Sequence, residues 1–278
     1  MTISTAAEDG LRLPVRIRSY LDAVVQACAA VRPPLVSLIL FGSSTRGGFS
    51  PESDVDLVVV VEDGMTAEGR IRLQQHITRL ETSFGFPPPT VGPTPAWRAR
   101  VERAEGHGFP CCVCTRGTWL SGDVAAILDL RRWEAPFVDR IVLASIVASA
   151  IAVWGDDLVP LIPVPRVGRL DVLKALFAFA CQLVLSAVMF PVLQDATRYA
   201  MGALKHSVHS CYFCYERRAA PLDEEIAFFN RRFGASRTLM DLLALRRRYR
   251  PSLVFILRCF PTVVSLHLRT VRDAAALR

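Results

Sequence analysis

The spacing of hydrophobic and polar positions changes about halfway along this chain. In the first half, short apolar runs such as LVSLILF and VDLVVVV alternate with segments whose apolar residues recur every three to four positions. Short runs rich in β-branched residues are typical of buried strands, and the longer spacing is typical of amphipathic helices. We therefore predict helices over 14–32 and 65–84, strands over 35–41 and 55–61, a third strand within FPCCVCTRGTW, and a helix starting at SGDVAAILDLRRW. The proline-rich FPPPTVGPTP interrupts regular structure.

The second half has the helical period almost throughout. Apolar residues at that period cover 136–154, 170–190, 194–216, 222–233, 236–248 and 251–272, with short Pro, Gly or Asp interruptions. The pattern predicts an α/β domain with a mixed sheet over 1–157, followed by an all-α helical bundle over 158–278. The two would join near WGDDLVPLIPVPRVG.

One segment, ALFAFACQLVLSAVMFPVL, is long enough to cross a bilayer by hydropathy alone. It contains Gln182, Ser186 and Pro191 and is flanked by helical periodicity, so we interpret it as a buried bundle helix. The start of the chain lacks the basic and apolar regions of a signal peptide. The eight cysteines are scattered through apolar segments rather than spaced as a disulfide framework. These observations favour a cytoplasmic protein with reduced thiols and no membrane contact.

Charge is distributed unevenly along the 278 residues. The net charge is +7, but the part from Lys205 onward holds 14 Lys and Arg against 6 Asp and Glu, which is +8, and leaves −1 for the rest. A basic region of this kind suits nucleic acid, nucleotide phosphates or an acidic partner, and a solvated arginine-rich face is the alternative.

The stretch LILFGSSTRGGFSPESDVDLVVVVE, which contains the turn between the first two predicted strands, carries the clearest chemistry. Residues i and i+2 of a strand share a face, so Asp54 and Asp56 point together while Val55 points into the core. Two convergent carboxylates repel unless a cation lies between them, and hard oxygen ligands select Mg²⁺ or Mn²⁺. Gly42 lacks a side chain, so the turn can bring backbone N–H groups and the Ser43 hydroxyl to a phosphate. The stretch therefore predicts a site for a metal-bound triphosphate.

These residues resemble the signature of the polymerase-beta-type nucleotidyltransferase superfamily, in which Gly-Ser after a hydrophobic strand precedes Asp-x-Asp in another. Here ten residues separate Gly42-Ser43 from Asp54-Val55-Asp56. VASAIAVWGDDLVPL is also similar to the element that closes the catalytic domain in many small bacterial nucleotidyltransferases, where a helical domain follows. The resemblance implies that Asp54 and Asp56 bind Mg²⁺ and that Gly42 and Ser43, with Ser44, hold the triphosphate. It further implies transfer of a nucleoside monophosphate to an acceptor hydroxyl.

Active members of this superfamily usually place a third carboxylate on a later strand, as a metal ligand or as the base. The corresponding segment here, GHGFPCCVCTRGTW, has cysteines instead, and no acidic residue lies between Glu105 and Asp123. Glu216 or Glu224 of the helical region could supply a base, although no motif selects either. Residues of CCVC alternate between the two faces of the strand, so Cys112 and Cys114 share one face, where we expect them to be small core residues.

Three further groups of residues leave alternatives open. Arg46 could contact a phosphate or be a plain surface arginine. Helical domains in this superfamily often supply a lysine to the β- or γ-phosphate, so Lys205 is the candidate and Lys174 the runner-up. His206, His209, Cys211 and Cys214 resemble zinc ligands, but a continuous helix points His209 and Cys211 to different faces, so the group does not have zinc-site spacing. The run LRRRYRPS suits a solvated helix end or a phosphate contact.

The hypothesis that unites these features is a cytoplasmic, Mg²⁺-dependent (or Mn²⁺-dependent) nucleotidyltransferase. It would use ATP to adenylylate a small hydroxylated molecule or a protein side chain. Nucleic acid is not the expected partner, since no reading motif is present. The alternative is a non-catalytic module that binds a nucleotide or a partner protein, like the antitoxin of a two-protein system. The missing third carboxylate favours that alternative, and the intact pair of aspartates disfavours it.

Overall fold

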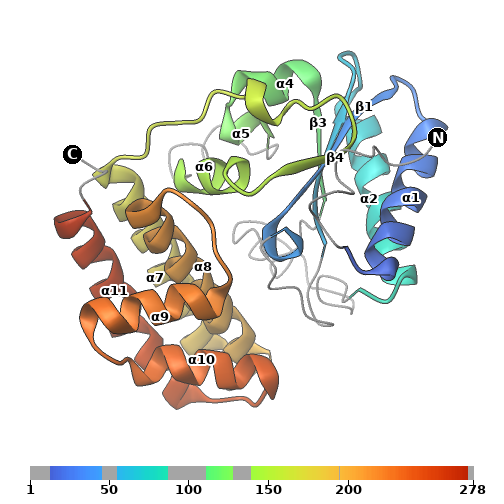
Figure 1. Cartoon of the computed structure of the whole chain (residues 1–278). Helices are drawn as coiled ribbons and strands as arrows, with labels where there is room; N and C mark the ends of the chain where they lie inside the picture. Colours follow the sequence, from blue (N-terminus) through green and yellow to red (C-terminus); the bar gives the residue numbers. More distant parts are fainter. Residues whose placement is uncertain (1–12, 46–54, 87–110, 128–138, 194, 275–278) are drawn as a thin grey trace. The chain divides into compact units, whose positions relative to one another are not determined.

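The computed structural model describes residues 13–45, 55–86, 111–127, 139–193 and 195–274, which are coloured in Figure 1. The chain forms two compact units. The first comprises residues 1–135 and 149–165, and the second comprises residues 136–148 and 166–278. The first is built around a sheet and the second is helical, so the predicted fold class of a mixed α/β domain followed by a helical region is confirmed.

Four strands form the sheet of the first unit in the order β3-β2-β1-β4. They are β1 (Leu35–Phe41), β2 (Asp56–Val61), β3 (Cys111–Thr115) and β4 (Ile151–Gly155). β1 pairs antiparallel with β2 and β4, whereas β2 and β3 are parallel. The prediction of helix over 136–154 is wrong at its end, because residues 151–155 pair with β1 as an edge strand. A short apolar run does not by itself distinguish strand from helix.

Helices cover both faces of this sheet (Figure 1). α1 (Val15–Ala29) and α2 (Ala67–Ser83) pack on one face, and their apolar sides share a core with alternate residues of β1 and β2. α4 (Arg116–Ser121) and α5 (Val124–Ile127) lie on the other side. The third strand ends at Thr115, before the end of the FPCCVCTRGTW segment, because Thr115 caps α4 by accepting a hydrogen bond from the Thr118 N–H. Trp119 of α4 is fully buried, and its indole donates to the Leu158 carbonyl beside the 3-10 turn Val159–Leu161.

Six helices form the second unit among the described residues: α6 (Ile141–Val147), α7 (Arg169–Met189), α8 (Ala196–Glu216), α9 (Leu222–Phe233), α10 (Arg237–Arg247) and α11 (Leu253–Asp273). α8 is central, with 13 of its 21 residues buried. All eight cysteines of the chain are free thiols, and six of them are buried.

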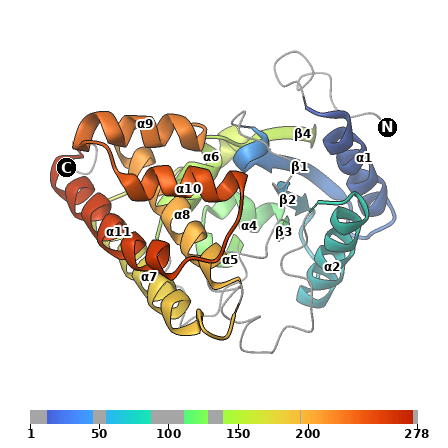
Figure 2. The same ribbon diagram turned by 90° about the horizontal axis from the view of Figure 1, so that it is seen from below.

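α7 and α11 have the length and composition of membrane-crossing helices, although such helices also occur in the cores of soluble proteins. We predicted a buried helix over the α7 segment, and this is correct for one side only. In the most apolar window of α7, 28% of the residues are buried, and in that of α11 the share is 39%. Figures 1 and 2 show the two helices side by side within the helical unit. Each therefore buries one side in the bundle and exposes the other.

Candidate functional site

The turn after β1 lies directly against the first carboxylate of β2. Phe41 and Asp56 are opposite each other in the antiparallel register, so Gly42 leaves the sheet beside the Asp56 side chain. Gly42 has φ +76°, and a Cβ placed on it would lie 1.9 Å from Asp56 Oδ2. Only glycine can combine this conformation with this approach. The backbone of the turn is therefore held at van der Waals distance from a carboxylate.

Polar groups converge in this turn, which is a single 3-10 turn over Gly42–Ser44. The Thr45 hydroxyl donates to the Gly42 carbonyl at 3.0 Å and tightens the turn. Ser43 is half-buried. Ser44 is 7% exposed, and its hydroxyl has no hydrogen-bond partner within the part of the chain that the structure describes. Closely spaced N–H and hydroxyl groups in a tight turn suit an anion such as phosphate.

Strand alternation separates the chemistry of β2 from the hydrophobic core. Val55 is fully buried with α1 and α2, whereas Asp56, the next residue, is half-buried on the opposite face. Asp54 and Arg46, both predicted site residues, lie outside the described residues, as do residues 87–95 of FPPPTVGPTP. No group of three or more His, Cys, Asp or Glu side chains among the described residues is placed to hold a metal ion. A half-buried carboxylate beside a backbone cradle fits a hard divalent cation.

The described part of β3 carries no carboxylate. Cys112 and Cys114 alternate with core residues and therefore lie on the same sheet face as Asp56, paired with Val58 and Val60 of β2. The Cys112 thiol donates to the Ile127 carbonyl at 2.8 Å, and burial raises the pKa of the Cys114 thiol well above its usual range. A neutral, buried thiol neither binds Mg²⁺ nor accepts the acceptor's proton.

Sequence reasoning missed Glu81, a buried carboxylate close to the site. Glu81 of α2 is 0% exposed, and its Oε1 accepts the Val55 N–H at 3.3 Å. Its signal was present, because Glu81 follows Leu73 and Ile77 at four-residue intervals on the buried side of α2. Since Val55 points to the core, Glu81 lies on the side of β2 opposite Asp56. It positions the strand and is not the missing third carboxylate.

The remaining predicted residues belong to the helical unit. Lys205 of α8 and Lys174 of α7 are both half-buried. The Arg218 guanidinium donates to Glu224 and holds the pKa of that carboxyl below its usual range, which makes Glu224 a poor base. Glu225, which the sequence did not single out, is 1% exposed, and its Oε2 lies 2.5 Å from Nδ1 of His209. This pair joins α9 to α8.

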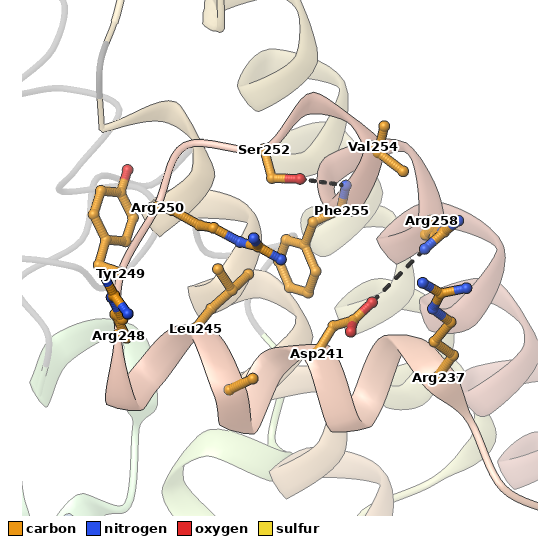
Figure 3. A pocket seen from close by; sticks show the side chains of 11 residues that line it. Arg237, Asp241, Leu245, Arg248, Tyr249, Arg250, Ser252, Val254, Phe255 and Arg258 are labelled. Atoms are coloured by element: carbon orange, nitrogen blue, oxygen red, sulfur yellow. Dashed lines mark hydrogen bonds and ion pairs between the residues drawn. The ribbon is translucent and has the colours of Figure 1, made fainter.

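A cavity of about 800 Å³ opens between α10 and the start of α11 (Figure 3). The run LRRRYRPS supplies Arg248, Tyr249 and Arg250 to its wall. Arg237 and Arg258 add two more guanidinium groups, and Asp241, 3.8 Å from Arg258, is the single carboxylate among the described residues of the lining. The excess of positive charge makes the cavity suitable for an anionic group.

Comparison with known proteins agrees with the geometry of the first unit. Residues 21–106 match the family model of the nucleotidyltransferase domain, and this range includes both Gly42 and Asp56. The chain resembles the crystal structure of spectinomycin adenyltransferase from Enterococcus faecialis, determined with ATP and spectinomycin. The match has 13% identity and a TM-score of 0.50, and covers 92% of this chain and 98% of that chain. No curated protein matches.

Proposed function

We propose that this chain, which carries a nucleotidyltransferase domain of the polymerase-beta type, is a cytoplasmic Mg²⁺-dependent enzyme that transfers AMP from ATP to a hydroxyl group. Nucleotidyl transfer as the general activity rests on the family model and on the fold. The observation that supports the proposal is the contact between Gly42 and Asp56, because it brings a turn suited to an anion next to a carboxylate suited to a divalent cation.

In the proposed reaction, the acceptor oxygen forms a bond to the α-phosphorus of ATP while the bond from that phosphorus to the bridging oxygen breaks. Pyrophosphate leaves, and the acceptor's proton passes to a base or to solvent. The turn at Gly42, with Ser43 and Ser44, would hold the phosphates through N–H and hydroxyl donors. Asp54 and Asp56 would hold Mg²⁺, which neutralises phosphate charge when bound.

Basic side chains would complete the triphosphate contacts. Arg46, which follows the turn, and Lys205 of the helical unit are the proposed donors, and each offers a positive charge to a phosphate oxygen. The protein's contribution in such transfers is mainly positioning and electrostatic stabilisation.

The acceptor class follows from charge. A pocket for a polycationic aminoglycoside needs several carboxylates, whereas the part from Lys205 onward has a charge of +8. Spectinomycin is bound in the structure of the Enterococcus enzyme. For the present chain we favour a neutral or anionic hydroxylated molecule, or a protein side chain, over an aminoglycoside.

A second candidate function is a non-catalytic module that binds a nucleotide or a protein partner, in the manner of an antitoxin. The observation that favours it is the pair Cys112 and Cys114 on the sheet face where a third carboxylate would act. The two functions differ in whether bound nucleotide is ever transferred.

The deciding experiment supplies labelled ATP, GTP, CTP and UTP with Mg²⁺ and cell extract to the full chain. We expect label from ATP on an acceptor, and none with the variant Asp54→Asn/Asp56→Asn. Asp22→Asn, an exposed carboxylate of α1, is the matched control and should transfer normally. Transfer that survives the double substitution would refute the metal site, and ATP binding without transfer would favour the binding module.

A further inference from the structure

The exposed side of α7 is a continuous apolar stripe. Its members recur at intervals of three and four residues, which places them on one side of the helix, opposite the buried Val172, Ala175 and Leu183. Five of them expose 42–66% of their surface. The stripe consists of Leu170, Leu173, Phe177, Cys181, Val184 and Val188.

α11, which packs beside α7, exposes a second apolar set (Figures 1 and 2). Its exposed fractions run from 40% to 58%. This set consists of Leu253, Val254, Leu257, Phe260 and Leu268. We call the two sets together the α7/α11 face.

The area of this face is that of an interface. Taken together, the exposed fractions of the two sets correspond to roughly 900 Å² of residue surface, whereas the largest apolar patch on a typical monomer is about 300–600 Å². A standard protein interface buries about 800 Å² on each partner. The α7/α11 face alone therefore supplies the area that one side of a stable dimer needs.

We infer that the α7/α11 face is covered by a second copy of this chain. The α7 stripe has the intervals of three and four at which helices pack against helices, so the stripes of two copies can pack together with the exposed side of α11 beside them. An apolar face is complementary to itself, as a two-fold dimer requires, because the same surface serves both partners. Its burial removes the apolar surface from water.

A lipid surface fits this face less well. Helices that lie on membranes are rich in Lys and Arg along their polar side, whereas residues 175–193 carry no charged residue. Crossing a bilayer would place Arg258 and the buried His267 of α11 in hydrocarbon. Lipid binding is therefore the competing outcome of the test.

The native protein contains its own probe of this contact. Cys181 lies in the middle of the α7 stripe and is the one cysteine of the eight that is exposed, since six are buried and Cys112 is half-buried. We expect sedimentation velocity to detect a dimer between about 1 and 100 µM protein. Over the same range, the labelling rate of Cys181 by N-ethylmaleimide should fall at least about tenfold as the face is covered.

Charged substitutions test the face directly. Val184→Glu/Leu257→Glu should give a monomer whose Cys181 is labelled at one rate at every concentration. Val15→Glu, at an apolar residue of α1 that is 76% exposed, should remain dimeric, and circular dichroism checks that each variant is folded.

Three results would overturn the inference. The first is a native chain that stays monomeric, with a labelling rate of Cys181 that does not change with concentration. The second is a Val184→Glu/Leu257→Glu variant that is still a dimer. The third is a native monomer that floats with phosphatidylcholine/phosphatidylglycerol vesicles. The last result would assign the face to lipid.

Discussion

Replacing Gly42 by alanine tests the contact on which the proposed function depends. The substitution has two costs that the structure separates. A non-glycine residue at φ +76° costs about 1–2 kcal/mol in backbone strain. The new Cβ also lies 1.9 Å from Asp56 Oδ2, and such overpacking costs about 1–3 kcal/mol more when neighbours must move. We expect a total loss of about 2–5 kcal/mol in the free energy of unfolding, with the lower end corresponding to rotation of the Asp56 carboxylate away from the new Cβ.

Gly64→Ala is the matched control. Gly64 also has a positive φ, +99°, but no atom lies within 4 Å of its added Cβ. It should therefore lose only the strain, about 1–2 kcal/mol. Urea denaturation monitored by circular dichroism measures both variants. The difference between them isolates the contact of Gly42 with Asp56.

The same contact should appear in function and in a double-mutant cycle. Displacing a positioned carboxylate by about 1 Å can cost about 100-fold in rate, so Gly42→Ala should lose most label transfer and Gly64→Ala should not. In an Asp56→Ala background, Gly42→Ala should cost no more than Gly64→Ala, because the carboxylate it would displace is absent. The reasoning is refuted if Gly42→Ala is as mild as Gly64→Ala and transfers label normally.

The remaining predictions concern groups that burial or hydrogen bonding perturbs. Burial lowers the pKa of His267 from 6.5 to about 4. Because the neutral imidazole is the form that the fold favours, the free energy of unfolding should fall by about 3 kcal/mol as pH falls from 6.5 to 4. Burial raises the pKa of Asp139 to about 6, so this carboxyl should lower the free energy of unfolding by a similar amount as pH rises from about 4 to 6. Between pH 4 and 6 the two groups change the free energy of unfolding in opposite directions. Asp139→Asn should therefore make the stability fall more steeply as pH falls, as measured by urea denaturation at several pH values, and an unchanged pH dependence would contradict this. Glu81→Ala should lower the free energy of unfolding by about 2–4 kcal/mol in urea denaturation, because the Val55 N–H loses its acceptor and a cavity forms. A loss below about 1 kcal/mol would contradict the buried hydrogen bond. Trp119→Phe should cost about 1–3 kcal/mol by leaving a buried carbonyl without its donor, and a thermal midpoint equal to that of the unchanged protein would argue against it.

Local periodicity was sufficient for most elements. The predicted strands around residues 38 and 58 and the helices from 169 onward are present within a few residues of their expected bounds. The sequence did not identify β4, because IAVW fits either period and becomes a strand only by pairing Leu38 with Trp154. It placed α7 in the bundle but did not reveal that one side would be exposed, since hydropathy does not specify how many neighbours a helix has.

The sequence by itself determined the order of the chemical groups: Gly-Ser after one strand, Asp-x-Asp at the start of the next, and no acidic residue within CCVCT. These follow from residue type and from the two-residue period of a strand, which are local properties. Only the tertiary structure decided that the backbone of Gly42 lies against Asp56 and that Glu81 holds the Val55 N–H from the core side. Both contacts join residues 14 to 26 positions apart, and their geometry depends on strand register and helix packing, which no local pattern specifies.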